Sequence, residues 1–283
     1  MITRLAGAVL RAVLVVALVL APSLLLDGTS ADAAQIAALV ALFAAVMTLV
    51  EYGSDAPSFV EFRDAPPYNR IRFIAILATA MLLIAVLQTP SDGAVVHRFV
   101  SILGRTIADA ADFPYSPVRL VVVAMPSDLS PALISQVRTA AGLSYVISIL
   151  SLLIFVALML AHRWPSRKRA FNVWVNLPMF DPSTGDDVVI RLYRDARFNL
   201  IAGFLLPFIL PALVKLFTVV SNEDLTGYLS HTQTLIWLTV AWAFLPASLL
   251  MRGIALAKVA MIIEGKRRKT YERAERDGYL ASS

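Results

Sequence analysis

Cysteine is absent from this chain, and histidine occurs only three times in its 283 residues. Without cysteine the chain can form no disulfide, no thiolate metal site and no thiol nucleophile. His97, His162 and His231 lie far apart, so a shared metal site is not expected. The glycine-rich phosphate loops and the G-x-S-x-G and H-E-x-x-H patterns are also missing. The sequence therefore predicts no catalytic residue, no cofactor and no metal ion, and it gives no support for enzymatic activity.

Charge is also scarce. Charged residues make up 16% of the chain and hydrophobic residues 58%, whereas soluble domains average about 25% and roughly 45–50%. The apolar residues gather in charge-poor runs, and about 20 residues in a helix suffice to cross roughly 30 Å of hydrocarbon. We therefore predict an all-α, polytopic integral membrane protein with a single membrane domain over residues 1–283. Its six expected spans cover about residues 5–26, 35–50, 71–88, 141–161, 200–220 and 234–251.

The distribution of basic residues predicts the orientation of these spans. If the N-terminus is cytoplasmic, all but five of the 25 Lys and Arg residues fall on the cytoplasmic side, as the positive-inside rule requires. The exceptions are Arg98, Arg105, Arg119, Arg138 and Lys215. This topology gives an external segment 89–140, a cytoplasmic connection 162–199 and a cytoplasmic tail 252–283. The many Arg and Ala residues favour a bacterial source, and hence the inner (plasma) membrane.

The first apolar run permits a second interpretation. Arg4, the apolar stretch and Ala31-Asp32-Ala33 resemble a signal peptide with an A-x-A cleavage site. Because the run is long for a signal sequence, we expect it to remain as an uncleaved anchor. Cleavage would remove one span without changing the orientation of the rest.

The external segment 89–140 is predicted to begin with a helix. Val96, Val100, Leu103 and Ile107 recur at helical spacing with polar residues between them, which indicates an amphipathic helix on a surface. The short run 118–125 is too brief to span and is interpreted as a buried strand or an extended linker. Ser130 and Pro131 then predict an N-cap and the first turn of a helix leading into the fourth span.

Two cytoplasmic segments share a short pattern. Residues 62–69 and 193–199 both contain aromatic-Arg-Asp-Ala followed by aromatic-Asn, each just before a span. The match indicates either a parallel repeat or only the usual composition of a membrane interface. The residues of this pattern that we predict to contact a partner or lipid are Arg63, Asp64, Asn69, Arg194, Asp195 and Asn199.

Two further cytoplasmic segments are candidates for the same kind of contact. Residues 171–180, which include Trp174, are apolar and aromatic but too short to span, so we place them at the headgroups or on a partner surface. The tail carries the basic cluster Lys266, Arg267, Arg268 and Lys269, which is expected to meet anionic lipid. The basic surface is too small to predict nucleic-acid binding.

The spans themselves contain few polar groups. No Asp or Glu lies in the middle of a predicted span, which weakens the case for ion-coupled transport. Pro207 and Pro211 predict a kink in the fifth span. Ser144, Ser148 and Ser151 share one face of the fourth span and indicate close helix packing.

Three functions are compatible with these features. The first is a non-catalytic membrane protein that binds a partner, either another membrane protein or a second copy, as an accessory, assembly or scaffolding subunit. The second is a transporter or channel that uses the kinked fifth span. The third is a lipid-modifying enzyme in which the two Arg-Asp pairs converge on a headgroup. We favour the first, because no catalytic motif is present and both sides carry surfaces suited to contacts.

Overall fold

A computed structural model describes residues 2–55, 57–88, 95–126, 129–161, 164–165, 171–180, 187–221 and 226–277. All regular secondary structure in these ranges is helical, as predicted. The helices are α1 (Ile2–Leu25), α2 (Ala31–Gly53), α3 (Tyr68–Leu87), α4 (Val95–Ala111), α5 (Pro117–Ala124), α6 (Pro131–Ala161), α7 (Val173–Asn176), α8 (Val188–Ser221), α9 (Thr226–Ser230) and α10 (Thr232–Arg276). Six of them, namely α1, α2, α3, α6, α8 and α10, are long and apolar enough to cross a membrane.

The six long helices match the six predicted runs, and the last three extend at least ten residues beyond their runs at one end. α6 starts ten residues before residue 141, α8 begins at Val188, and α10 continues to Arg276. Hydropathy delimits only the apolar part of a helix, so the polar ends of these helices lie beyond the predicted spans. In α10 this added part becomes important for the candidate site.

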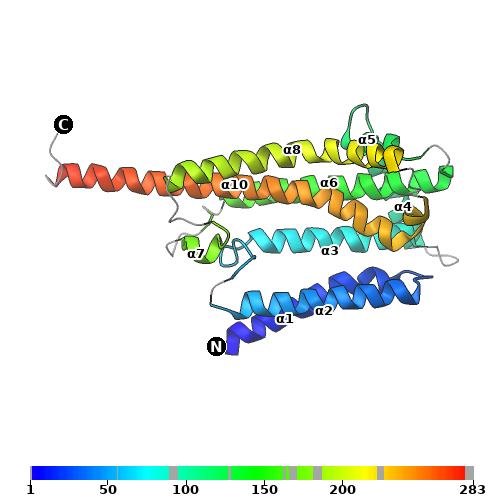
Figure 1. Cartoon of the computed structure of the whole chain (residues 1–283), viewed down its shortest axis with the longest axis horizontal. Coiled ribbons are helices and arrows are strands. Elements are labelled where there is room, and N and C mark those ends of the chain that lie inside the picture. Colours follow the sequence, from blue (N-terminus) through cyan, green and yellow to red (C-terminus); the bar gives the residue numbers. More distant parts are fainter. Residues whose placement is uncertain are drawn as a thin grey trace.

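The helices run side by side and form a long bundle with two ends (Figure 1). We call the end that carries α7 and both chain termini the basic end, and the end that carries α4, α5 and α9 the opposite end. The α1–α2 hairpin forms one layer and attaches to α3 through α1, while α10 packs against α8, α6 and α3. Two apolar cores fill the bundle. One contains Leu83, Leu143 and Ile236, and the other contains Phe62, Phe155 and Leu256.

α8 and α10 pack closely because two glycines lie where the helices meet. A Cβ atom on Gly203 would lie 2.8 Å from the carbonyl oxygen of Pro246, and one on Gly253 would lie 2.9 Å from that of Ala196. Both distances are too short for a real Cβ contact. Any larger residue at either position would push the two helices apart.

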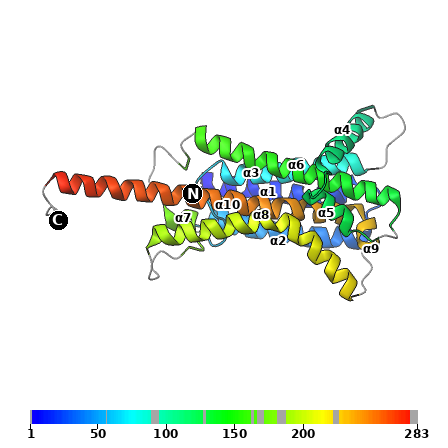
Figure 2. The same ribbon diagram turned by 90° about the horizontal axis from the view of Figure 1, so that it is seen from above.

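The prolines of α8 are compensated by α10. Because Pro211 has no N–H, the carbonyl oxygen of Pro207 lacks its usual partner four residues later. The indole N–H of Trp242 on α10 donates to this oxygen at 3.4 Å. The last part of α8 bends away from the bundle after these prolines (Figure 2), in agreement with the predicted kink.

The prediction for residues 118–125 was wrong, because this run forms helix α5 rather than a strand or linker. The Ser116 hydroxyl caps α5 by accepting the backbone N–H of Arg119 at 3.0 Å, and Pro117 occupies the first helical position. A good N-cap followed by proline favours a helix strongly enough to outweigh the β-branched valines. The predicted helix start at Ser130 and Pro131 is confirmed, with Ser130 accepting from Leu133 N–H.

Candidate functional site

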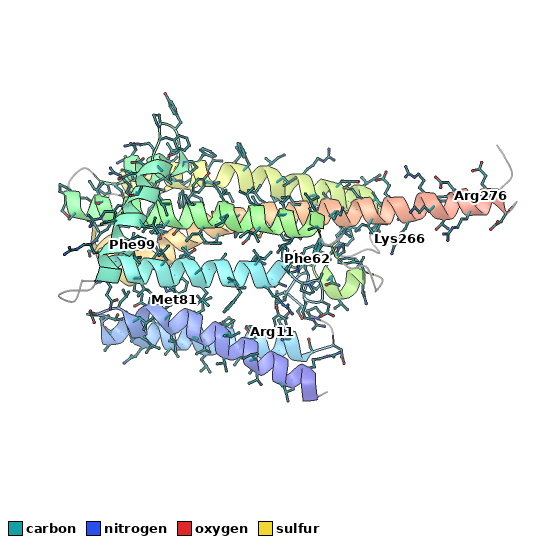
Figure 3. All side chains as sticks on the ribbon, turned by 180° about the vertical axis from the view of Figure 1, so that it is seen from behind. Arg11, Phe62, Met81, Phe99, Lys266 and Arg276 are labelled. Atoms are coloured by element: carbon teal, nitrogen blue, oxygen red, sulfur yellow. The ribbon has the colours of Figure 1, made fainter. Side chains whose placement is uncertain are left out.

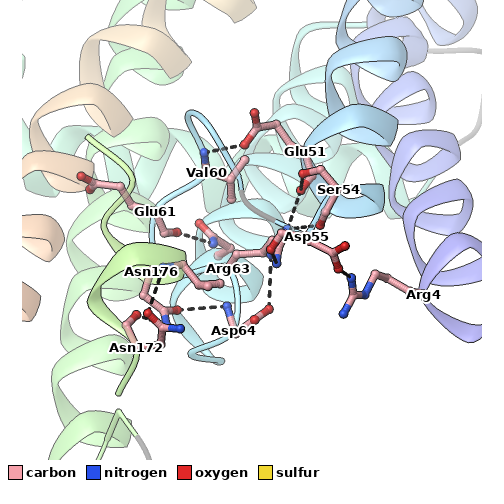
Figure 4. Close-up of polar contacts among 12 residues, drawn as sticks. Arg4, Glu51, Ser54, Asp55, Val60, Glu61, Arg63, Asp64, Asn172 and Asn176 are labelled. Atoms are coloured by element: carbon pink, nitrogen blue, oxygen red, sulfur yellow. Dashed lines mark hydrogen bonds and ion pairs between the residues drawn. The ribbon is translucent and has the colours of Figure 1, made fainter. Parts of the chain in front are cut away.

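The connection between α2 and α3 is held by one buried carboxylate at the basic end. Glu51, in the last turn of α2, is 5% exposed. Its two oxygens accept the backbone N–H groups of Ser58, Phe59 and Val60, all at 3.0 Å. Figure 4 shows the contact with Val60. A charged acceptor that meets three converging donors is much stronger than a neutral one. Glu51 therefore fixes the path of the chain as it turns back from α2.

Arg63 completes this turn from the other side. Its guanidinium donates to the carbonyl oxygens of Glu51 at 2.8 Å, Ser54 at 2.9 Å and Asp55 at 3.3 Å (Figure 4). These are orphan carbonyls at the C-terminus of α2, where positive charge is favourable. The side chain is only 7% exposed and also pairs with Asp64 at 3.3 Å. Arg63 is therefore bound internally, which leaves it little capacity to hold a lipid headgroup.

The connection after α6 docks onto this turn through Asn176. The backbone oxygen of Asn176 accepts from Phe62 N–H at 2.7 Å, and its side-chain oxygen accepts from Asp64 N–H at 3.1 Å. Nearby, the indole of Trp164 donates to the Ala65 oxygen at 3.0 Å. These bonds join segments that lie about a hundred residues apart in the sequence.

Phe62 lies at the centre of this junction in an unusual backbone conformation. Its φ is 52°, in the left-handed region that bulky residues rarely adopt, and it is 1% exposed. Its ring lies 4.6 Å from Tyr68 and 5.4 Å from Trp164 between centroids, and Tyr68 lies 5.6 Å from Phe155. Burial of this aromatic cluster stabilises the strained conformation.

A bidentate ion pair links the junction to α10. Arg252 donates to both carboxylate oxygens of Glu61, at 2.6 and 2.8 Å. The side chains are 27% and 10% exposed, so both are largely shielded from water. This ion pair therefore connects the α2–α3 turn with α10.

The two aromatic-Arg-Asp-Ala segments differ in conformation. Arg63 and Asp64 lie in an irregular turn, whereas Arg194 and Asp195 lie within the second turn of α8. Each asparagine donates to a backbone carbonyl oxygen of its own segment. Asn69 donates to that of Glu61 at 2.8 Å, eight residues back. The buried Asn199 donates to that of Asp195 at 2.7 Å, four residues back. The two segments therefore share a sequence pattern but adopt different local structures.

Beyond the junction, α10 leaves the bundle as a single straight helix (Figures 1 and 3). Its last part, from Glu264 to Arg276, carries mostly charged and exposed side chains. Lys266, Lys269, Arg273 and Arg276 follow the spacing i, i+3, i+7, i+10 and therefore share one face. We call these four residues the basic stripe. None of them pairs with an acidic side chain in the part of the chain that the structure describes.

The predicted basic cluster is divided between this face and others. Lys266 and Lys269 belong to the basic stripe, but Arg267 pairs with Asp187 at 2.6 Å and Arg268 lies 3.7 Å from Glu272. Hydrogen bonds from Val189 N–H and from Arg267 favour the charged carboxylate and hold the pKa of Asp187 below its usual value. Arg273 and Arg276 were not among the predicted contacts, although their helical spacing from Lys266 places them on the same face.

The remaining predicted contacts are more dispersed. Trp174 belongs to α7, but its side chain lies outside the described residues, as do residues 181–186 of the same connection. Within the described ranges, no three His, Asp or Glu side chains group as metal ligands. A cavity of about 100 Å³ between α6, α8 and α10 is lined mainly by apolar side chains, with Tyr145 and Ser148 as polar members.

The six apolar helices define the class of this protein as a multi-pass α-helical membrane protein. Comparison with family models, with curated proteins and with solved structures finds no match for the chain.

Proposed function

We propose that this protein is a non-catalytic membrane subunit that binds an acidic surface of a partner protein through the basic stripe of α10. The observation that carries the proposal is the projection of this charged helix beyond the bundle. A helical segment with polar residues on all sides gains little hydrophobic stabilisation by packing against its own chain. Four cations on one face that pair with no acidic side chain among the described residues suit a partner that presents carboxylates.

The length of the basic stripe favours a protein partner over lipid headgroups. Ten residues separate Lys266 from Arg276, which corresponds to about 15 Å along a helix. Electrostatic attraction to a charged surface decays over roughly 8 Å at physiological salt. Because α10 continues along the bundle axis (Figure 3), Arg273 and Arg276 lie beyond effective reach of headgroups that contact Lys266.

The proposal is tested by affinity purification from native membranes in mild detergent. Wild-type protein should retain a specific partner, and Lys269→Gln/Arg273→Gln should lose it because the stripe loses half of its charge. Arg197→Gln/Arg268→Gln removes the same net charge from exposed positions outside the stripe and should retain the partner.

Two outcomes would overturn the proposal. One is purification of the wild-type protein alone even after chemical cross-linking in the membrane. The other is equal loss of the partner from both double variants, which would show that only net charge matters. Both variants leave the packed bundle untouched, so a folding defect is not expected.

The distribution of basic residues supports a cytoplasmic location for both termini, which we place in a bacterial inner membrane. The basic end holds Arg63, Arg194 and the basic stripe, and cytoplasmic ends attract such residues. An impermeant thiol reagent should label a cysteine introduced at Tyr271 only after the cells are opened. Labelling in sealed cells would reverse the orientation.

Transport and lipid chemistry are less well supported. The cavity beside α8 offers few polar groups, and the Ser148 hydroxyl already donates to the Tyr145 oxygen at 2.8 Å. Arg63 is engaged in capping α2. Neither an ion pathway nor a shared headgroup pocket gains support from these contacts.

A further inference from the structure

Helix α4, at the opposite end, presents two chemically different edges. The bundle side of α4 is made of small residues: Ala108 is fully buried, and a Cβ atom on Gly142 of α6 would lie 2.6 Å from the Cα atom of Ala108. On the sides that face away from the bundle, Phe99 and Leu103 are 66% and 46% exposed. α4 is thus attached mainly by its small residues, while Phe99 and Leu103 remain uncovered.

The direction of each edge follows from contacts with α6. We call the side of α4 that carries Arg98, Arg105 and Asp109 the charged edge, and the side that carries Phe99, Leu103 and Ile107 the apolar edge. Asp109 lies 3.8 Å from Arg138. Arg138 precedes Gly142 by four residues, or about 6 Å, and therefore lies further toward the opposite end. Ile107, on the other edge, packs against the apolar core. The charged edge consequently faces outward along the bundle axis, and the apolar edge faces the depth of the spans.

Two exposed arginines extend the charged edge. Arg98 and Arg105 are seven residues apart and lie on the same side of α4 as Asp109. α4 runs across the bundle and stands out from its side (Figure 2), and Phe99 marks the opposite end in Figure 3. The exposed rings of Phe113 and Tyr115 follow directly after the helix. Aromatic side chains are enriched at membrane–water interfaces.

From this arrangement we propose that α4 is an interfacial membrane helix. Its Phe99–Leu103 edge lies among lipid acyl chains, and Arg98 and Arg105 face the phosphate headgroups. A helix with one apolar edge and one basic edge suits a lipid surface. The separation of apolar from charged side chains favours lipid over a second protein as the occupant. The apolar edge faces the interior of the membrane, and the arginines face away from it. This inference is independent of the basic stripe.

The test uses the absence of native cysteine, which permits single-site labelling. Leu103→Cys and Arg105→Cys lie two residues apart and about 200° around the helix, so they form a matched pair. Each is labelled with an environment-sensitive fluorophore. The purified full-length protein is then placed in phosphatidylcholine–phosphatidylglycerol vesicles, with or without phosphatidylcholine brominated on its acyl chains.

We expect the label at position 103 to emit at shorter wavelength and to be quenched several-fold more by brominated chains than the label at 105. Iodide in the buffer should show the reverse order. Equal iodide quenching at both positions would overturn the proposal. A label at 103 protected from iodide but insensitive to brominated lipid would also overturn it, because protein then covers this edge. Since both side chains are exposed, unchanged gel-filtration profiles should accompany either substitution.

Discussion

Replacement of Glu51 by glutamine tests whether the buried carboxylate holds the α2–α3 turn. Glu51→Gln keeps the shape of the side chain but removes its charge and turns one acceptor oxygen into a donor. In the best arrangement the amide oxygen takes the place of Oε2 and still accepts from Ser58, Phe59 and Val60. Hydrogen bonds to charged groups contribute about 1.5–3 kcal/mol, and neutral ones about 1 kcal/mol. Loss of about 1 kcal/mol at each of three bonds destabilises the protein by about 3 kcal/mol.

Thermal unfolding in mild detergent, followed by size-exclusion chromatography, measures this effect. At roughly 2–4 °C per kcal/mol, Tm should fall by about 6–12 °C. Glu272→Gln, which removes an exposed carboxylate from the projecting part of α10, should leave Tm almost unchanged. If Glu51→Gln is as stable as this control, the three amide contacts do not hold the turn, and the reasoning fails.

Three further substitutions probe the contacts between helices in the same unfolding assay or by hydrogen exchange. Trp242→Phe leaves the Pro207 carbonyl without its donor and should cost about 1–3 kcal/mol; no change would show that the 3.4 Å contact is unimportant. Arg252→Gln strands the carboxylate of Glu61 and should cost about 3 kcal/mol, while the Glu61→Gln/Arg252→Gln double variant should cost less than the sum of the single variants. Asp187→Asn should speed hydrogen exchange in the first turn of α8 at neutral pH. In the wild type the faster exchange should appear only in acid. Because the pKa of Asp187 is lowered in the folded state, its charged carboxylate stabilises the first turn of α8 above about pH 4, and this stabilisation is lost as the pH falls through the folded pKa.

The membrane spans could be predicted from sequence because their physical cause is local. A run of about 20 apolar residues satisfies its own backbone hydrogen bonds in a helix and needs no information from the rest of the chain. The same local reasoning failed for α5, where the valines indicated a strand and the Ser116–Pro117 cap decided the outcome. In this short run the capping residues outweigh the β propensity of the valines.

The contacts at the basic end depend on segments that lie far apart in the sequence, so hydropathy and spacing could not reveal them. Arg63 was predicted as a surface contact, but its role depends on the path of the chain around Glu51 and on the docking of Asn176. The pairing of Arg252 with Glu61 spans 191 residues. By contrast, the basic stripe could have been found from the sequence, since helical spacing alone places its members on one face of α10.

The two groups of contacts at the basic end act on the same property of α10, its rotation about its own axis. Arg252 is bound to Glu61, while Glu264 accepts from the Tyr193 hydroxyl at 3.2 Å and Arg267 pairs with Asp187. Glu264 is rotated by about 120° from Arg252 at 3.6 residues per turn. A helix held on two different faces cannot roll, so these contacts direct the basic stripe away from α8. The buried junction and the proposed partner surface are therefore coupled, because a change in the rotation of α10 at Arg252 would also turn the stripe.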